Sequence, residues 1–420
     1  MSAPAAARDG PWWRAIERRE WPALLACAGA YFTLLAGYYM LRSLREAYAL
    51  QAGRASIDQL FYASFAVMLL ILPLYWYIVA RVRRRRLATV VYGAVIAVFA
   101  ALAVAFDVRP ESRVLAAVYF VAVTSLNLFL VTVFWSVMVD LWRSASAQRL
   151  FGMIAAGGSA GALFGPAFNA LFVRDLGPPA IILLACGMLA LTIALARLAQ
   201  LSASVAQQTE ARLDLAVGGR ARDDLARLCR SPYLLAIASL IVAGQVIGAW
   251  MYNEQARYVE AHYATLGERA ELFARLDFLV NVLALLLQTG IVGWLAARGG
   301  MRVALGVVPV LLIASLVGVV LLPIGAMLLA TQVARRAIDY GLFKPTREML
   351  FTVLKPESKF KSKSLIDTLL QRGGDSLGQG IYGAVATLGL AGVAGLGAGV
   401  AALMLFVALW VAARFRESSA

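Results

Sequence analysis

The chain has 420 residues, of which 61% are hydrophobic and only 15% are charged, whereas soluble domains carry about 25% charged residues. Its formal net charge is +15, but the basic residues fall in the turns between long apolar runs, so they need no nucleic-acid partner to explain them. This composition excludes an ordinary soluble domain and indicates a protein whose partner is the lipid bilayer.

The N-terminal residues 1–21 are polar and arginine-containing, so they lack the apolar core and cleavage site of a signal peptide. Long apolar runs follow. Because a span needs about 20 residues and lipid leaves free backbone without hydrogen-bond partners, these runs predict about twelve transmembrane helices. The runs cover residues 22–40, 60–80, 87–106, 114–139, 150–173, 180–198, 233–252, 278–297, 303–333, 340–354, 365–386 and 388–413.

A polar connector divides the chain into two similar parts. Residues 71–93 and 286–308 share a pattern, because each is a span that ends in a short basic turn before the next span. The pattern predicts an all-α membrane protein like the major facilitator superfamily, with two six-helix halves. The expected domains are an N-terminal segment 1–21, a first half 22–201, a cytoplasmic connector 202–231, a second half 232–414 and a tail 415–420.

Two other features of the sequence concern packing and chemistry. The glycine-rich segment that begins at Gly157 corresponds in position to the glycines near Gly373, and it favours close helix packing over phosphate binding. Three scattered cysteines argue against a disulfide framework. The single histidine, His262, has no evident ligand partners, so we expect no metal and no cofactor. We also expect no enzyme activity.

Arginines follow the even-numbered spans, while the opposite loops hold fewer cations. The positive-inside rule then predicts that both termini are cytoplasmic. We expect an integral protein of the bacterial inner membrane, and a monomer by analogy with transporters of this form.

The chain concentrates its lysines in one segment between apolar runs, residues 334–375. An ionisable side chain at membrane depth costs roughly 2.5 to 3.5 kcal/mol, so cations there predict a polar path or a partner charge. All lysines of the chain lie in this segment, at Lys344, Lys355, Lys359, Lys361 and Lys363. They indicate an anionic cargo, and the alternative is a basic cytoplasmic loop.

The tenth span carries charged residues at helical spacing. Arg335 and Asp339, like Lys344 and Glu348, are four residues apart and can neutralise each other. Pro345 lacks an amide proton and should kink this helix. The binding candidates here are Arg336, Lys344, Arg347 and Glu348. The alternative interpretation is a structural salt bridge at a helix end.

Four other spans supply further candidates. The eleventh holds a polar stripe that should face the bundle interior, although polar packing between helices would give the same pattern. Arginines near the end of the first span suit phosphate or carboxylate, or they snorkel to the interface. The candidates are Asp367, Gln371, Arg372 and Asp375 in and before the eleventh span, Arg42 and Arg45 in the first, Asn253 in the seventh and Asn127 in the fourth.

Several segments resemble the NTP/NDP exchange transporters, the ATP/ADP translocase family of plastids and intracellular bacteria, and its shorter bacterial relatives. The matching blocks are YYMLRSLREA, FWSVMVDLW, RLFGMIAAGGSAGALFGP, KPTREMLF and KFKSKSLIDTLLQRGGDSLG. The resemblance implies exchange of a nucleotide-class anion. It aligns the family's functional residues with Arg45, Glu348 and Lys361 or Lys363. The family's glutamate in the fourth span is absent, and Asn127 is the nearest polar residue.

These observations leave three hypotheses open. The first is a secondary transporter of an organic or phosphorylated small-molecule anion, with nucleotide exchange as the form that the resemblance implies, working by alternating access. The second is a proton-coupled exporter of hydrophobic or cationic compounds. The third is a non-transporting membrane sensor or partner protein that kept the transporter fold.

Overall fold

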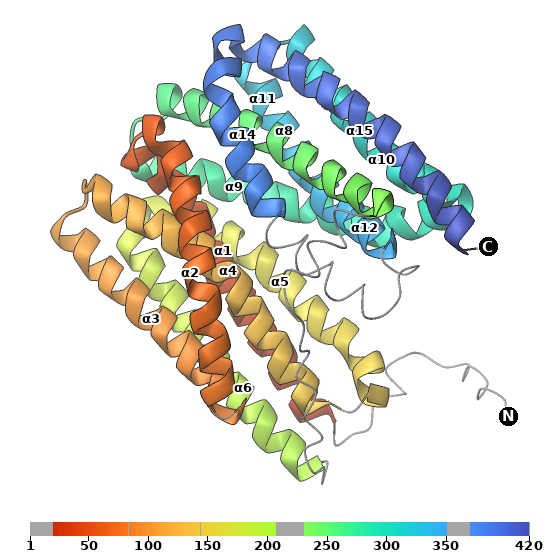
Figure 1. Cartoon of the computed structure of the whole chain (residues 1–420). Coiled ribbons are helices and arrows are strands. Elements are labelled where there is room, and N and C mark those ends of the chain that lie inside the picture. Colours follow the sequence, from red (N-terminus) through yellow and green to blue (C-terminus); the bar gives the residue numbers. More distant parts are fainter. Residues whose placement is uncertain (1–19, 83, 143, 207–230, 351–369, 420) are drawn as a thin grey trace, which may run out of the picture.

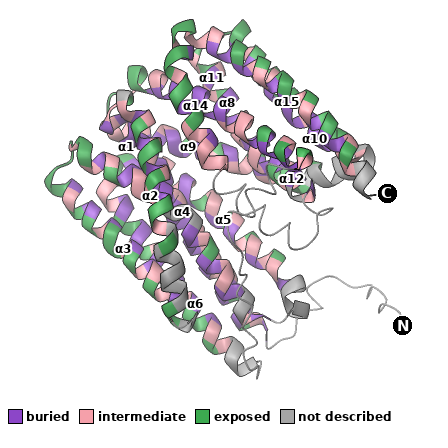
Figure 2. Cartoon of the chain, in the orientation of Figure 1, coloured by how far each residue is buried: buried purple, intermediate pink, exposed green. Residues whose placement is uncertain are grey.

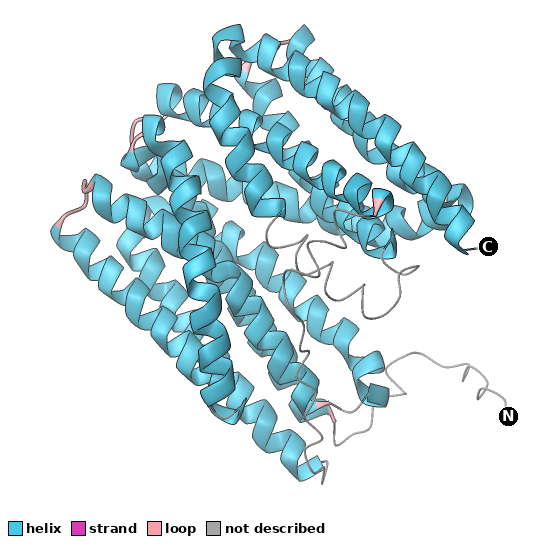
Figure 3. Ribbon diagram, in the orientation of Figure 1, coloured by secondary structure: helices cyan, strands magenta, loops and turns pink. Residues whose placement is uncertain are grey.

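The computed structural model describes residues 20–82, 84–142, 144–206, 231–350 and 370–419. Within these ranges the chain is helical and has no strand (Figure 3). Eight helices of the described ranges are long and apolar enough to cross a membrane. The prediction of an all-α protein with membrane-spanning helices is confirmed, and the finer prediction of about twelve spans in two six-helix halves stays a prediction.

The described helices form two groups in chain order, side by side in Figure 1. The N-terminal group consists of α1 (Trp21–Ala52), α2 (Ile57–Arg81), α3 (Arg84–Val108), α4 (Arg113–Leu141), α5 (Ser144–Leu176) and α6 (Pro178–Ala206). The C-terminal group consists of α8 (Pro232–His262), α9 (Leu266–Leu286), α10 (Val292–Leu321), α11 (Gly325–Ile338), α12 (Lys344–Leu350), α14 (Gln371–Val385) and α15 (Gly389–Ser419).

Each group packs around a central helix that touches most of its neighbours. In the N-terminal group α1 packs against α4, α5 and α6, and in the C-terminal group α8 packs against α14 and α15. The two groups meet where α9 contacts α1 and α5, and where α14 contacts α2. Any polar side chain on the facing sides of α1 and α8 therefore lies near the junction of the groups.

Exposed residues lie along the outer faces of the helices (Figure 2), and many of them are large and apolar. Leu70, Leu171 and Phe406 are more than two-thirds exposed, at 75%, 71% and 74%. Such a surface would be unstable in water, whereas lipid solvates it and the helical backbone satisfies its own polar groups. This pattern fits an integral membrane protein.

Glycines allow the closest helix contacts. A Cβ atom on Gly161 of α5 would collide with the carbonyl oxygen of Phe32 on α1. On α14, a Cβ atom on Gly378 would lie 2.7 Å from the Cβ atom of Ala249 on α8. The predicted packing role of the segment that begins at Gly157 is therefore confirmed, and Gly378 makes a similar close contact, although Gly373 itself has nothing within 4 Å of its Cβ position.

Two helix boundaries differ from those predicted. The run 303–333 is two helices, because α10 ends at Leu321 and α11 begins at Gly325. Pro323 lies in the break, and proline disfavours helical geometry in the residue before it. The expected kink near Pro345 takes the form of a π-helical turn, η4 (Asp339–Phe343), directly before α12. Such turns open the backbone ladder and are frequent at functional sites.

Candidate functional site

Arg42 and Arg45 lie well inside α1 rather than near its end. The helix continues to Ala52, and its C-terminal turns are buried on nearly every side. Arg42 is only 8% exposed. The alternative that these arginines snorkel to the interface is therefore wrong for Arg42, because its guanidinium lies between helices instead of reaching the membrane surface.

Arg45 is held by partners from its own helix group, one of which also contacts the other group. It forms an ion pair with the neighbouring Glu46, and its Nη1 donates to the hydroxyl oxygen of Thr124 on α4 at 3.4 Å. The other carboxylate oxygen of Glu46 accepts a hydrogen bond of 2.7 Å from the hydroxyl of Tyr252 on α8. Glu46 thus joins the two groups while it neutralises Arg45.

Arg42 makes its direct contacts with aromatic rings, and the carboxylate of Asp277 interacts with it electrostatically without forming an ion pair. Its guanidinium carbon lies 5.5 Å from the ring centre of Tyr39 and 5.9 Å from that of Tyr340. Nη2 donates to the hydroxyl of Tyr340 at 3.3 Å. Within the described residues no carboxylate forms an ion pair with it. Cation–π contacts hold the side chain in place without cancelling its charge.

Arg336 of α11 pairs with a buried carboxylate of α9. The partner is Asp277, which is 1% exposed. Asp277 places only one oxygen in this bond, and its Oδ2 has no hydrogen-bond partner in the described part of the chain. The neighbouring Arg335 donates to Gln332, and it also interacts electrostatically with Asp339, the residue with which the sequence paired it.

Arg372 connects α14 to α4 of the other group. Its Nη2 donates to the backbone carbonyl of Thr124 at 3.3 Å, and its Nη1 lies 3.7 Å from the carboxylate of Asp375 one turn later. Because the Thr124 hydroxyl also accepts from Arg45, Thr124 brings Arg45 and Arg372 together. We call Arg42, Arg45, Arg336 and Arg372 the arginine cluster.

Buried carboxamides beside the cluster end in free donors. Arginine can only donate, so the bond of 3.1 Å from Arg335 fixes which atom of the Gln332 amide is the oxygen. The Nε2 of Gln332 then donates to Gln255 Oε1 at 2.8 Å. The Nε2 of Gln255 is left without a partner in the described residues.

A second pair of amide side chains also ends in a donor without a partner. Asn253 donates to the carbonyl of Ala249 at 2.9 Å and to Gln379 Oε1 at 2.6 Å. The Nε2 of Gln379 and the Nε of Arg45 again have no partner among the described atoms. A buried donor without an acceptor is costly. Apart from one oxygen each of Asp277 and Asn169 and the hydroxyl of Ser376, the orphaned groups in this region are donors, and a ligand rich in acceptor oxygens would satisfy these donors.

The balance of charges in the arginine cluster also favours an anionic ligand. Three members of the arginine cluster have a carboxylate partner: Arg45 has Glu46, Arg336 has Asp277 and Arg372 has Asp375. Arg42 has none in the described part of the chain, so these groups together carry an excess positive charge. The arrangement suits an anion, which would supply both the missing charge and the missing acceptors.

The remaining predicted residues lie in several places. Asn253 is buried, as described above. Lys344 is exposed, Arg347 is buried and Gln371 is half-buried. Asn127 lies in α4 and Glu348 in α12, but their side chains are outside the described part of the structure, as are Lys361, Lys363 and Asp367 altogether. The structure therefore brings together Arg42, Arg45, Arg336, Arg372 and Asp375.

Sequence reasoning missed the uncharged residues of the site. Thr124, Tyr252 and Tyr340 each bond an arginine or its carboxylate partner, and Gln332 anchors an amide chain. Threonine and tyrosine are common in apolar helices, so their presence alone is no signal. The one usable signal was a glutamine inside an apolar run, because a buried amide needs partners.

Two ion-pair groups also join the helix groups at one end of the molecule. Arg54, just after α1, binds Glu260 near the end of α8 at 2.7 Å. Arg174 near the end of α5 pairs with Glu271 of α9, which also pairs with Arg275. Farther along α9, Asn281 donates to the carbonyl of Ala162 on α5 at 2.8 Å. These contacts hold the groups together at this end.

Comparisons with known proteins agree with this geometry. A family model described as TLC ATP/ADP transporter matches residues 180–417. Curated protein sequences give no match.

Solved structures of membrane transporters share the fold. A bacterial homolog to the human lysosomal transporter Spinster is 14% identical, with a TM-score of 0.56, and the alignment covers 96% of this chain and 98% of that chain. The nucleoside transporter NupG is 12% identical, with a TM-score of 0.64 over 93% and 99%. A POT family transporter in complex with a thioalcohol conjugated peptide is 12% identical, with a TM-score of 0.64 over 98% and 100%. At these identities the similarity concerns the fold alone.

Proposed function

The chain belongs to the TLC ATP/ADP transporter family, and on this premise we propose that it is a secondary transporter that exchanges a nucleotide-class or other phosphorylated anion. Family and fold make it an integral membrane transport protein. The arginine cluster carries the proposal of an anionic cargo, because it places an uncompensated guanidinium and several unpartnered donors at the junction of the two helix groups.

The proposed architecture is two six-helix halves, residues 22–201 and 232–414, joined by a cytoplasmic connector, with both termini cytoplasmic and the chain in a bacterial inner membrane as a monomer. The order of the helices supports it, since α1 and α8 occupy equivalent central places and glycines of α5 and α14 pack on them in the same way. In transporters with this organisation, the halves rock around a site at their interface.

The mechanism follows from the way the arginines are paired. The anion binds Arg42 first, because no carboxylate of the described residues forms an ion pair with it. Arg45 and Arg372 become available only when their contacts with Glu46 and Asp375 loosen. Glu46 also holds Tyr252 of the other group. Binding of the anion at Arg45 therefore changes the charge around a carboxylate that connects the two groups, and this couples cargo binding to the rocking that moves the site from one side to the other.

The other two hypotheses have less support. A proton-coupled exporter of cations would place carboxylates in excess in its site, whereas here every carboxylate of the cluster already faces an arginine. A sensor without a cargo would be expected to satisfy its buried polar groups internally, whereas Gln255 and Gln379 keep free donors in the described part of the chain.

Exchange in proteoliposomes tests the proposal. Vesicles are loaded with unlabelled ATP, ADP, phosphate or a sugar phosphate, and labelled nucleotide is added outside. We expect saturable uptake that needs an internal anion, is lost in Arg45→Ala and is retained in Arg302→Ala, which changes an exposed arginine of α10. If folded protein takes up no nucleotide with any internal anion, the nucleotide assignment fails, and the other anions are then tested as labelled substrates.

A further inference from the structure

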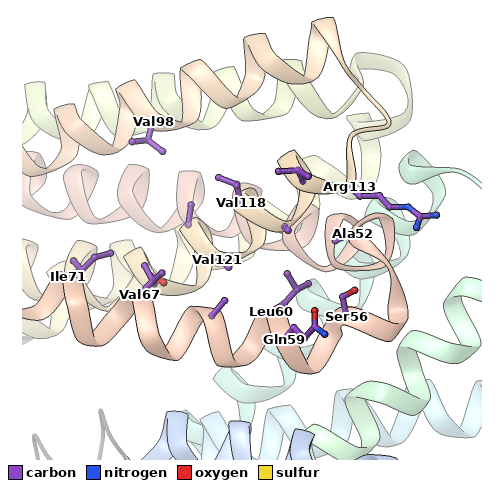
Figure 4. Close-up of a pocket in the computed structure, with 15 residues that line it drawn as sticks. Ala52, Ser56, Gln59, Leu60, Val67, Ile71, Val98, Arg113, Val118 and Val121 are labelled. Atoms are coloured by element: carbon purple, nitrogen blue, oxygen red, sulfur yellow. The ribbon is translucent and has the colours of Figure 1, made fainter.

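An apolar groove lies outside the candidate site, on the side of the N-terminal group where α2, α3 and α4 meet (Figure 4). Its volume is about 740 Å³. That falls within the range of roughly 300–1,000 Å³ that ligand sites occupy. Its walls are aliphatic, with side chains from all three helices: Leu60, Val67, Ile71, Val98, Val118 and Val121. A hollow of this kind on a membrane protein is filled by something apolar.

Most of the polar side chains of this groove lie at one end, and Ser125 lies farther along α4. Arg113, the first residue of α4, lies at the polar end with Ser56 and Gln59, and Ile71 lies at the opposite end (Figure 4). Arg113 is exposed. It forms no ion pair or hydrogen bond with the described residues, so its charge is available to a ligand. These residues begin or precede the helices, where a spanning helix meets the membrane surface.

The length of the groove matches one leaflet of a bilayer. From Ser56 to Ile71 is a distance of about 22 Å at a helical rise of about 1.5 Å per residue. One leaflet contributes about 15 Å of hydrocarbon, half of the roughly 30 Å core, and the headgroup region adds several ångströms. An acyl chain that starts at the polar end would run along the aliphatic walls to the middle of the membrane.

We propose that this groove binds one phospholipid of the adjacent leaflet, with an acyl chain between α2 and α4 and its phosphate on Arg113. A guanidinium suits a phosphate because it offers paired donors in the plane of its charge. Ser56 and Gln59 supply further hydrogen bonds to the headgroup region. The inference rests on the chain being an integral membrane protein and does not depend on which anion the candidate site carries.

The lipid would also form the wall behind the arginine cluster. Ser125 lines the groove and donates to the carbonyl of Ser64 on α2 at 3.4 Å. The preceding residue, Thr124, bonds Arg45 and Arg372. Filling the groove therefore supports the stretch of α4 that positions both arginines.

Photo-crosslinking tests the proposal on the full chain in lipid nanodiscs. The probe is phosphatidylglycerol with a diazirine in one acyl chain, and cross-linked peptides are mapped by mass spectrometry. We expect the adducts to concentrate in residues 56–71 and 113–125. Arg113→Gln should reduce them about fivefold, the ratio for about 1 kcal/mol per basic residue at a charged membrane surface. Ala63→Phe, at an exposed groove position, should remove most of them.

Two matched variants serve as controls. Arg109→Gln removes an exposed arginine at the same end of the bundle, and Ala66→Phe adds the same ring to the same helix, but neither residue lines the groove. Both should leave the adducts unchanged. Adducts spread evenly over the lipid-facing helices would show ordinary surrounding lipid and overturn the proposal. So would Arg113→Gln and Ala63→Phe variants that give as many adducts as the unaltered chain. Melting temperatures of all variants confirm that each is folded.

Discussion

Replacing Arg42 by glutamine separates anion binding from folding. Arg42 is 8% exposed, and in the described residues it has two tyrosine rings and one hydrogen bond of 3.3 Å as partners. Burying a charge without a counter-ion costs several kcal/mol, so a protein selected for stability alone would not keep it. We therefore expect its function to lie in the cargo, and its removal to affect transport far more than stability.

The structure allows both effects to be estimated. Arg42→Gln breaks one long hydrogen bond, which contributes about 1 kcal/mol, and no ion pair, and it removes the cost of a buried charge, so the free energy of unfolding should not fall by more than about 1 kcal/mol. A charged hydrogen bond to the anion contributes about 1.5 to 3 kcal/mol, so the half-saturating concentration should rise about 10- to 150-fold. Arg45→Gln differs because it leaves Glu46 buried without its cation, and the loss of one partner of such a pair costs about 3 to 5 kcal/mol.

The assay pairs two measurements on both variants. Initial exchange rates against external nucleotide concentration give the half-saturating value, and thermal unfolding in detergent gives the stability. Arg42→Gln should show weak binding with a nearly unchanged melting temperature, whereas Arg45→Gln should show both losses. If Arg42→Gln exchanges nucleotide with the affinity of the unaltered chain, or unfolds as readily as Arg45→Gln, the charge-balance reasoning is refuted.

Three further predictions concern stability, measured by thermal unfolding in detergent. Asp277→Asn should destabilise the protein by about 3 to 5 kcal/mol, and adding Arg336→Gln should recover most of the loss; no recovery would contradict their pairing. Glu271→Gln should lower the free energy of unfolding by more than the ~0–1 kcal/mol that an exposed ion pair contributes, since Glu271 is 8% exposed and bridges two arginines. Gly161→Ala should destabilise through its clash with α1, whereas Gly152→Ala, with open space around it, should be neutral or stabilising by up to about 1 kcal/mol; equal effects would contradict the packing role.

Composition and periodicity were sufficient to predict the class of the protein, and the resemblance of several sequence blocks predicted its family. Long apolar runs have one solution in lipid, so an all-helical protein followed directly. The glycine segment near Gly157 was also predictable, because close packing without a side chain needs only local sequence information. The run 303–333 was misjudged because the apolar residues continue across the break at Pro323, and hydropathy does not register a change of direction.

The arrangement of the site was less predictable than its composition. The arginines could be named because charges in apolar helices are rare. Which of them lacks a counter-ion depends on contacts between distant helices: Tyr252 bonds Glu46 across 206 residues, and Arg336 meets Asp277 across 59. The pairs four residues apart on one helix were visible in the sequence, but the sequence did not show that Arg335 donates its hydrogen bond to the amide of Gln332, three residues away.

In the proposed mechanism the two arginines of α1 have different tasks, although they lie one turn apart. Arg42 would offer a fixed charge to the cargo, because its tyrosine neighbours do not compete with an anion. Arg45 would exchange one anionic partner for another, and the carboxylate that it releases is the one that bonds Tyr252 of the opposite group. An empty site would keep Arg45 paired with Glu46, whereas a loaded site would separate them, so that rocking is coupled to the cargo. Net movement would then require cargo in both directions, which is the behaviour of an exchanger rather than of a uniporter.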